Sequence, residues 1–280
     1  MKKIVSALGV LAMLTACQKE NSLEKTEIEP GSGGGGNPTG TRLVQTGLRI
    51  GADTVTTIYR YNSANLLSGF TYSGTVSGQS GDAQIRIVRN AANVINALVI
   101  KAEVYAAIGV DSIVTNFVHD AARNQYKYSV ATYKYMGIPA SDSAVFNYDA
   151  AGKLGSVVNY HDDGSGYSPD GKEEYTYSGN NLASSKTYAF DGSTFTLEQT
   201  TQYEQYDNSV NPLQFQADAP ALGMTSHYSA NNVVKQTVTD HTSASTVTGI
   251  SVYAYNAANR PTKAISTNST GSAITTYVYQ

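Results

Sequence analysis

The sequence predicts an all-β fold, an antiparallel up-and-down meander of about 16 strands forming a strongly curved or rolled sheet. The composition supports it: the 280 residues include 21 tyrosines and no tryptophan, and only 15% are charged. Aromatic and β-branched side chains fit a pleated, half-buried surface. A tyrosine motif recurs at intervals of about 29 residues, with further turn signals between its copies, as expected of hairpins built on a repeat.

The motif is Tyr-x-Tyr, followed by Asn or Asp and, three residues later, by Gly or Asn. Asn and Asp side chains bond to nearby backbone N–H groups, and Gly or Asn accepts the positive φ of a tight turn. Each copy therefore predicts a strand, a turn and a second strand. The last tyrosine before each turn, or the residue in its place, is Tyr61, Arg89, His119, Tyr148, Tyr177, Tyr206, Tyr228 and Tyr255.

The strand count constrains the shape of the sheet. Open twisted sheets of more than about ten strands usually curl, split into layers or close, so a flat sheet is not expected. We expect a rolled sheet, with closure and splitting as alternatives. Residues 91–108 also suit one face of a helix, but we expect a strand there because the repeat continues through them.

Residues 1–16 have the layout of a secretory signal peptide: Lys2 and Lys3, then an apolar run over residues 4–14. That run is shorter than the roughly 20 residues of a membrane-spanning helix. The ending Leu-Thr-Ala-Cys resembles the lipobox of bacterial lipoproteins, which implies that Cys17, the only cysteine, receives the lipid. Gln18, where an aspartate would resemble an inner-membrane retention signal, favours the outer membrane, on its periplasmic or surface side.

Residues 17–40 are polar and rich in glycine, a composition that predicts a flexible tether. Residues 41–280 form the predicted β-domain. Their hairpin motif resembles the YD repeats of Rhs-type proteins. It is still more similar to uncharacterised lipoproteins of Bacteroidota, through Tyr-Asp-x-x-x-Asn-Pro at 206–212 and Asn-Asn-Val-Val at 231–234. The resemblance implies a repetitive antiparallel sheet on a cell-envelope lipoprotein, and it carries over no catalytic residue.

The sequence lacks the local motifs that mark common classes of enzyme. It contains no Gly-x-Ser-x-Gly elbow, no His-Glu-x-x-His helix and no phosphate-binding loop. We therefore expect no enzyme and no cofactor. The net charge of −3 gives no basic patch for nucleic acid. The four histidines are scattered, and His119 and His227 are expected to pack rather than to bind a ligand; the other two are His161 and His241.

One acidic loop is a weak candidate for calcium, because it contains Asp162, Asp163 and Asp170. Calcium prefers six to eight oxygen ligands, but the spacing differs from that of the twelve-residue calcium loop. A solvated hairpin end explains the same residues. The recurring tyrosines could offer a platform for sugars or peptides, although cross-strand aromatic pairs ordinarily stabilise the sheet itself.

We expect a lipid-anchored, non-enzymatic protein of the cell envelope that acts as a scaffold or binding module for a glycan, protein or lipid. One alternative is a carrier holding an apolar ligand on the concave face of the sheet, suggested by the apolar stretch 94–118. Another is a polysaccharide-acting enzyme whose carboxylates come from distant repeats, since fold does not decide function.

Overall fold

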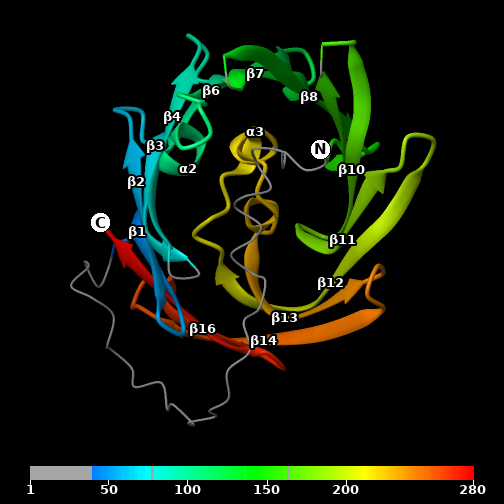
Figure 1. Ribbon diagram of the computed structural model, residues 1–280. Coiled ribbons are helices and arrows are strands. Elements are labelled where there is room, and N and C mark those ends of the chain that lie inside the picture. Colours follow the sequence, from blue (N-terminus) through cyan, green and yellow to red (C-terminus); the bar gives the residue numbers. More distant parts are fainter. Residues whose placement is uncertain (1–39, 77–78, 136, 163) are drawn as a thin grey trace.

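The computed structural model describes residues 40–76, 79–135, 137–162 and 164–280. Within them, antiparallel strands form one closed barrel in which each strand pairs with its sequence neighbours (Figure 1). The strands are β1 (Leu43–Ile50), β2 (Asp53–Tyr61), β3 (Leu67–Val76), β4 (Gln79–Arg89), β5 (Ile95–Ala102), β6 (Ile113–Asp120), β7 (Gln125–Tyr135), β8 (Ile138–Tyr148), β9 (Leu154–Asp162), β10 (Tyr167–Ser178), β11 (Asn181–Phe190), β12 (Phe195–Val210), β13 (Asn231–Asp240), β14 (Ser245–Tyr255), β15 (Pro261–Asn268) and β16 (Gly271–Tyr279).

The barrel closes where β1 pairs with β16, in a register from Leu43 opposite Tyr279 to Ile50 opposite Ala273. Outside the strands, the N–H of Arg42 bonds to the carbonyl of Gln280, and the N–H of Gln280 bonds to the carbonyl of Arg42. The predicted antiparallel all-β meander is confirmed. The predicted rolled sheet is replaced by a closed barrel, because pairing the first strand with the last leaves no open edge.

One end of the barrel is built from tight turns with a shared hydrogen-bonding pattern. In the β2–β3 turn, Oδ1 of Asn62 accepts bonds from the N–H groups of Ala64 and Leu66, each at 3.0 Å. Asn65 adopts a φ of 60°, which Asn tolerates better than most residues. The same arrangement is made by Asn90 in the β4–β5 turn, Asp149 in the β8–β9 turn and Asn256 in the β14–β15 turn.

The β12–β13 connection at this end departs from the predicted repeat. Tyr206 and Tyr228 occupy two successive motif positions, yet no hairpin separates them. Residues 211–230, which we call the inset, instead contain η2 (Gln216–Asp218), α3 (Ala219–Leu222) and η3 (Thr225–His227). Proline cannot donate to a β-ladder, and Pro220 lies in the first turn of α3. The repeat is therefore not continuous through the β-domain.

The stretch 91–108 combines both structures that its sequence allows. Its centre is strand β5, paired with β4 and β6, as predicted. The strand prediction is wrong for Glu103–Ala106, which form the short helix α2. Asp111 and Val110 then lead into β6. Since α2 contains no buried residue, local helix preference decides its conformation rather than packing.

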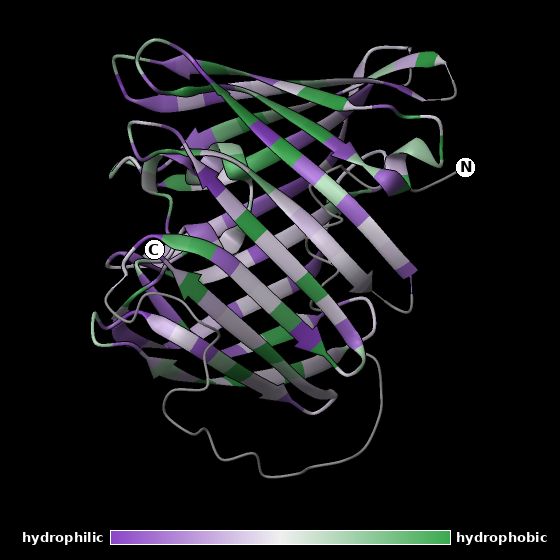
Figure 2. Ribbon diagram, turned by 90° about the vertical axis from the view of Figure 1, so that its left-hand side faces the viewer, coloured by the Kyte–Doolittle hydropathy of each residue, from purple (hydrophilic) through white to green (hydrophobic). Residues whose placement is uncertain are grey.

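Alternation along the strands separates an inner from an outer face. Tyr59 and Tyr61 contact the buried core, whereas Arg60 between them is exposed. Tyr175 belongs to the core, and its neighbours Glu174 and Thr176 occupy the opposite face of β10. Figure 2 shows hydrophilic and hydrophobic positions interspersed along the strands of the side facing the viewer, as alternation of inward and outward residues produces. The outer wall carries charged residues such as Arg60 together with exposed apolar residues such as Ile58 and Val252. The inner wall is rich in aromatic and aliphatic residues.

Candidate functional site

The inset lies inside the ring of strands, where α3 is seen within the barrel in Figure 1. Ala221 and Leu222 of α3 belong to the same buried cluster as residues of the barrel wall. Phe215 and Tyr228 pack against that cluster from either side of α3. The wall residues of the cluster are Leu67, Phe70, Ile85, Ile87, Ile95, Leu98, Tyr126, Ala144, Phe146, Leu154, Tyr175 and Leu182. The turn end of the barrel is thus filled by the chain's own residues.

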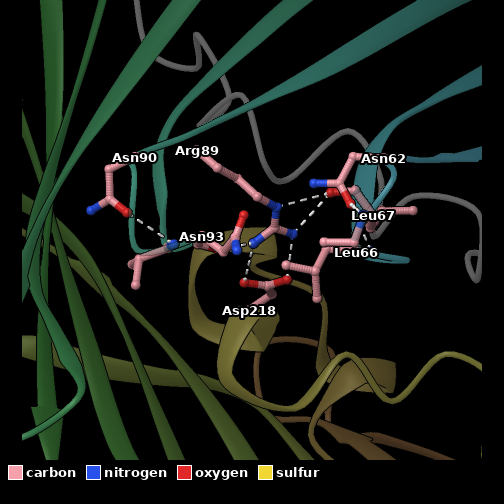
Figure 3. A network of polar contacts seen from close by, with 9 residues as sticks. Asn62, Leu66, Leu67, Arg89, Asn90, Asn93 and Asp218 are labelled. Carbon is pink, nitrogen blue, oxygen red and sulfur yellow. Dashed lines mark hydrogen bonds and ion pairs between the residues drawn. The ribbon is translucent and has the colours of Figure 1, made fainter.

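An ion pair holds the inset to the wall (Figure 3). The guanidinium of Arg89, at the end of β4, donates to Oδ1 and Oδ2 of Asp218 at 3.0 and 2.6 Å. It also donates to the carbonyls of Leu67, at 2.8 Å, and Asn93, at 2.7 Å. The side chains of Arg89 and Asp218 are 7% and 15% exposed. This bidentate geometry gives the strongest form of side-chain ion pair and fixes the position of η2.

Arg89 stands at the position where the motif otherwise has tyrosine. Two of the motif tyrosines make a different contact, since their hydroxyls donate to backbone carbonyls. Tyr61 donates to Leu43 at 2.7 Å, and Tyr206 donates to Leu182 at 2.7 Å. Burial raises the pKa of each of these two tyrosines to about 12. These two hydroxyls therefore stabilise the barrel wall. At the equivalent motif position, Arg89 instead binds Asp218 and so holds the inset.

The two motifs that carried the lipoprotein resemblance meet at the base of the inset. The carboxylate of Asp207 accepts bonds from the N–H of Asn232, at 3.1 Å, and from its Nδ2, at 2.9 Å. Nδ2 of Asn211 donates to the carbonyls of Ser226 and Ser229 at 2.7 and 3.0 Å. These side chains bring the ends of β12 and β13 together, so that the inset can leave the sheet.

His227 is the most deeply buried titratable residue of the inset, with 2% of its surface exposed. Neither ring nitrogen has a hydrogen-bond partner among the described residues. Its ring packs edge-on against Phe215 at 4.9 Å, as expected for a packing role. Burial without a polar partner lowers the pKa of His227 to about 3. The folded state therefore holds this imidazole neutral.

A hollow of about 300 Å³ lies between the inset and three turns of the barrel. The turns are those joining β6 to β7, β8 to β9 and β10 to β11. Tyr126, Tyr148 and Tyr177 contribute from the wall, and His227 and Tyr228 contribute from the inset. This hollow has the size and the aromatic lining of a small-molecule site.

The residues predicted as sites from the sequence do not meet in one place. Cys17 and Asp163 lie outside the described residues. Oδ1 of Asp162 accepts bonds from Gly164 and Gly166, as a turn-forming aspartate does. In the described ranges, no group of three His, Cys, Asp or Glu side chains could hold a metal ion. The calcium loop of Asp162, Asp163 and Asp170 stays a prediction, since one of its members lies outside those ranges.

The remaining histidines occupy separate positions. His119 packs edge-on against Tyr126 at 5.2 Å. His161 contacts Asp142, with 2.7 Å between Nδ1 and Oδ1, and Nε2 of His241 lies 2.9 Å from Oγ1 of Thr200.

Arg89 and Asp218 were not predicted as functional residues. The signal for Arg89 was its place in the motif, but nothing local indicated Asp218 as its partner.

Comparison with known proteins supports the lipoprotein prediction. Residues 1–18 match the family model described as the prokaryotic membrane lipoprotein lipid attachment site. No curated protein matches the chain. No helix in the described part of the chain is long and apolar enough to cross a membrane.

The fold is similar to solved structures described as porin-like proteins. One, from Bacteroides uniformis ATCC 8492, is 15% identical with a TM-score of 0.53, and the match covers 86% of this chain and 98% of that one. Another, from Bacteroides vulgatus ATCC 8482, is 10% identical with a TM-score of 0.54, covering 86% and 99%. At these identities the likeness is one of fold, and these comparisons give no support to the YD-repeat resemblance.

Replacing Arg89 by alanine should loosen the inset. The change leaves the Asp218 carboxylate buried without its cation, which costs about 3–5 kcal/mol and lowers Tm by roughly 6–20 °C. Limited digestion with chymotrypsin should cleave within residues 211–230 faster than in the parent protein. Lys127→Ala is the control, because its exposed ammonium lies 3.5 Å from Asp120 and solvent screens such a pair. Equal digestion rates for both variants would contradict the anchoring role.

Acid should destabilise the protein through His227. Its pKa is lower in the folded state than in the unfolded state, so the unfolded chain binds the extra proton. The contribution of neutral His227 to the free energy of unfolding is fully present above about pH 6.5. It falls by up to about 1.4 kcal/mol per pH unit as the pH drops toward 3. Urea unfolding of His227→Leu should show a flatter dependence on pH over this window. Gln202→Ala, an exposed change that removes no titratable group, should keep the parent's slope. A parental slope in His227→Leu would refute this assignment.

Proposed function

We propose that this protein is a non-enzymatic binding module of the cell envelope, held to the outer membrane by lipid on Cys17, with its barrel in water. The lipid attachment match over residues 1–18 is the observation that carries the anchor. Residues 17–40 then serve as the tether between the lipid and the barrel, and Cys17 is the first residue of the mature chain.

The polarity of the outer wall supports a barrel in water. A barrel embedded in lipid needs an outward apolar band about 25 Å tall. Here Lys172 and Glu174 form an ion pair of 2.8 Å on the outer face of β10. A second pair, Lys235 with Glu204, joins β13 and β12 at 2.5 Å. Charges in the middle of strands are costly in lipid, so they favour water around the wall.

The filled interior argues against passage through the barrel and against storage of an apolar ligand at the turn end. Ile95 and Leu98, from the apolar stretch that suggested a carrier, are 0% and 4% exposed and pack within the protein core. These surfaces are already covered in the folded chain. The hollow between the inset and the turns is lined by tyrosines and amides together with Leu154, Pro220 and two alanines. Binding at this end of the barrel fits the residues better than transport does.

Changing Cys17 to alanine should separate the barrel from the membrane without unfolding it. Lipid anchoring depends on the acyl chains, which contribute about 0.8 kcal/mol per buried methylene. We expect the parent protein in the membrane fraction and Cys17→Ala in the aqueous fraction, with the same Tm. Fractionation followed by immunoblotting measures the distribution.

Ser6→Ala, a change within the signal sequence that spares the cysteine, is the matched control and should stay with the membrane. If Cys17→Ala resists extraction by carbonate as the parent does, the anchor proposal is wrong. A barrel inserted in the bilayer would give that result.

A further inference from the structure

We propose that the hollow between the inset and the turns of the barrel binds a neutral saccharide ring. This inference rests on the proposed binding function and specifies its ligand class. Three features of the hollow carry it: its shape between rigid elements, its aromatic lining, and a group of amide side chains on that lining.

The hollow is formed by parts that are themselves fixed. On the wall side, Oδ1 of Asp149 accepts bonds from Ala151 and Lys153, each at 2.9 Å, which holds the β8–β9 turn. On the inset side, the Arg89–Asp218 ion pair holds η2. A volume of about 300 Å³ suits a ligand of one or two sugar rings rather than a long chain. A site preformed in this way avoids much of the ordering cost of binding.

Tyrosines supply the aromatic part of the lining, beside Leu154, Ala217, Ala219 and Pro220. Tyr148 and Tyr177 come from successive hairpins, and Tyr228 comes from the inset. The amphipathic ring of tyrosine offers an apolar surface together with a polar tip. A sugar ring has the matching character, because its C–H groups form apolar patches and its hydroxyls lie around the edge. Placing tyrosines around a hollow therefore favours a ring-shaped polar ligand over an aliphatic chain.

The amides at the rim supply the polar part. Gln125, Asn180 and Gln214 line the hollow. Each amide offers two donors and an acceptor, which match hydroxyl groups that both donate and accept. Three amides beside aromatic rings are suited to a ligand rich in hydroxyls.

Charge in the hollow favours a neutral ligand. None of the described residues that line it is aspartate or glutamate. The one cation, Lys153, donates through Nζ to the carbonyl of Gly179 and lies 5.1 Å from the ring centroid of Tyr177. Its charge is therefore already engaged within the protein. The ring nitrogens of His227 are covered, so this residue contributes only packing surface.

The test is a binding titration of the full-length protein in detergent micelles, measured by saturation-transfer NMR and calorimetry. The probes are glucose, galactose, N-acetylglucosamine and their disaccharides, with glutamate and hexanoate as charged probes of similar size. We expect at least one saccharide to bind with a Kd of about 10 mM or tighter. The double variant Asn180→Ala with Gln214→Ala, and separately Tyr177→Leu, should each weaken that binding by about tenfold or more.

Gln202→Ala, which removes an exposed amide on the outer wall, should leave binding unchanged. This variant and the double variant should keep the parent's Tm, whereas Tyr177→Leu removes a ring that packs against the core. No saccharide binding, equal binding by the double variant, or tighter binding of glutamate or hexanoate would each overturn the inference. These outcomes leave the lipid anchor untouched, because release by Cys17→Ala is measured separately. Failure of that release would in turn leave the saccharide titration in micelles valid.

Discussion

Closure of the sheet is the constraint on which the rest of the structure depends. Pairing β1 with β16 removes both edges of the sheet, but a barrel of this many strands encloses more space than its own wall side chains can fill. That interior space must be filled either by water or by a segment of the protein itself. At the turn end, the protein fills it with residues 211–230, whose Ala221 and Leu222 complete the core. The inset thus fills interior space that exists because the barrel is closed.

The ion pair between Arg89 and Asp218 fixes the inset, which has no strand partners to hold it in place. A segment of twenty residues outside the ladder has lost its strand partners, and its short helices contribute little stability alone. A bidentate, nearly buried ion pair fixes one point of the segment, and the Asp207–Asn232 contact fixes its base. The hollow with its three amides lies between these fixed parts. The proposed binding at this site therefore depends on the same contacts that fill the barrel.

The sequence predicted the strands well because its signals were local. Asn62 and Asp149 form the turns for the reason expected from their side chains. Tyr61, Tyr148 and Tyr255 are the last residues of their strands, as the motif predicts. Closure was not predictable from local signals, because it depends on pairing between residues far apart in the sequence, such as Leu43 and Tyr279. The inset was missed because Tyr206 and Tyr228 mimic successive repeats. The partnership of Arg89 with Asp218, 129 residues apart, is visible only in three dimensions.

The central claim is that the barrel wall faces water while the lipid alone enters the membrane. The direct measurement uses a single cysteine at Gln202 or Thr248, both exposed on the outer face, labelled with a fluorophore in proteoliposomes. The account predicts quenching by iodide in the water and none by lipids with brominated chains. Quenching by brominated lipids, with protection from iodide, would contradict it and place the wall in the bilayer.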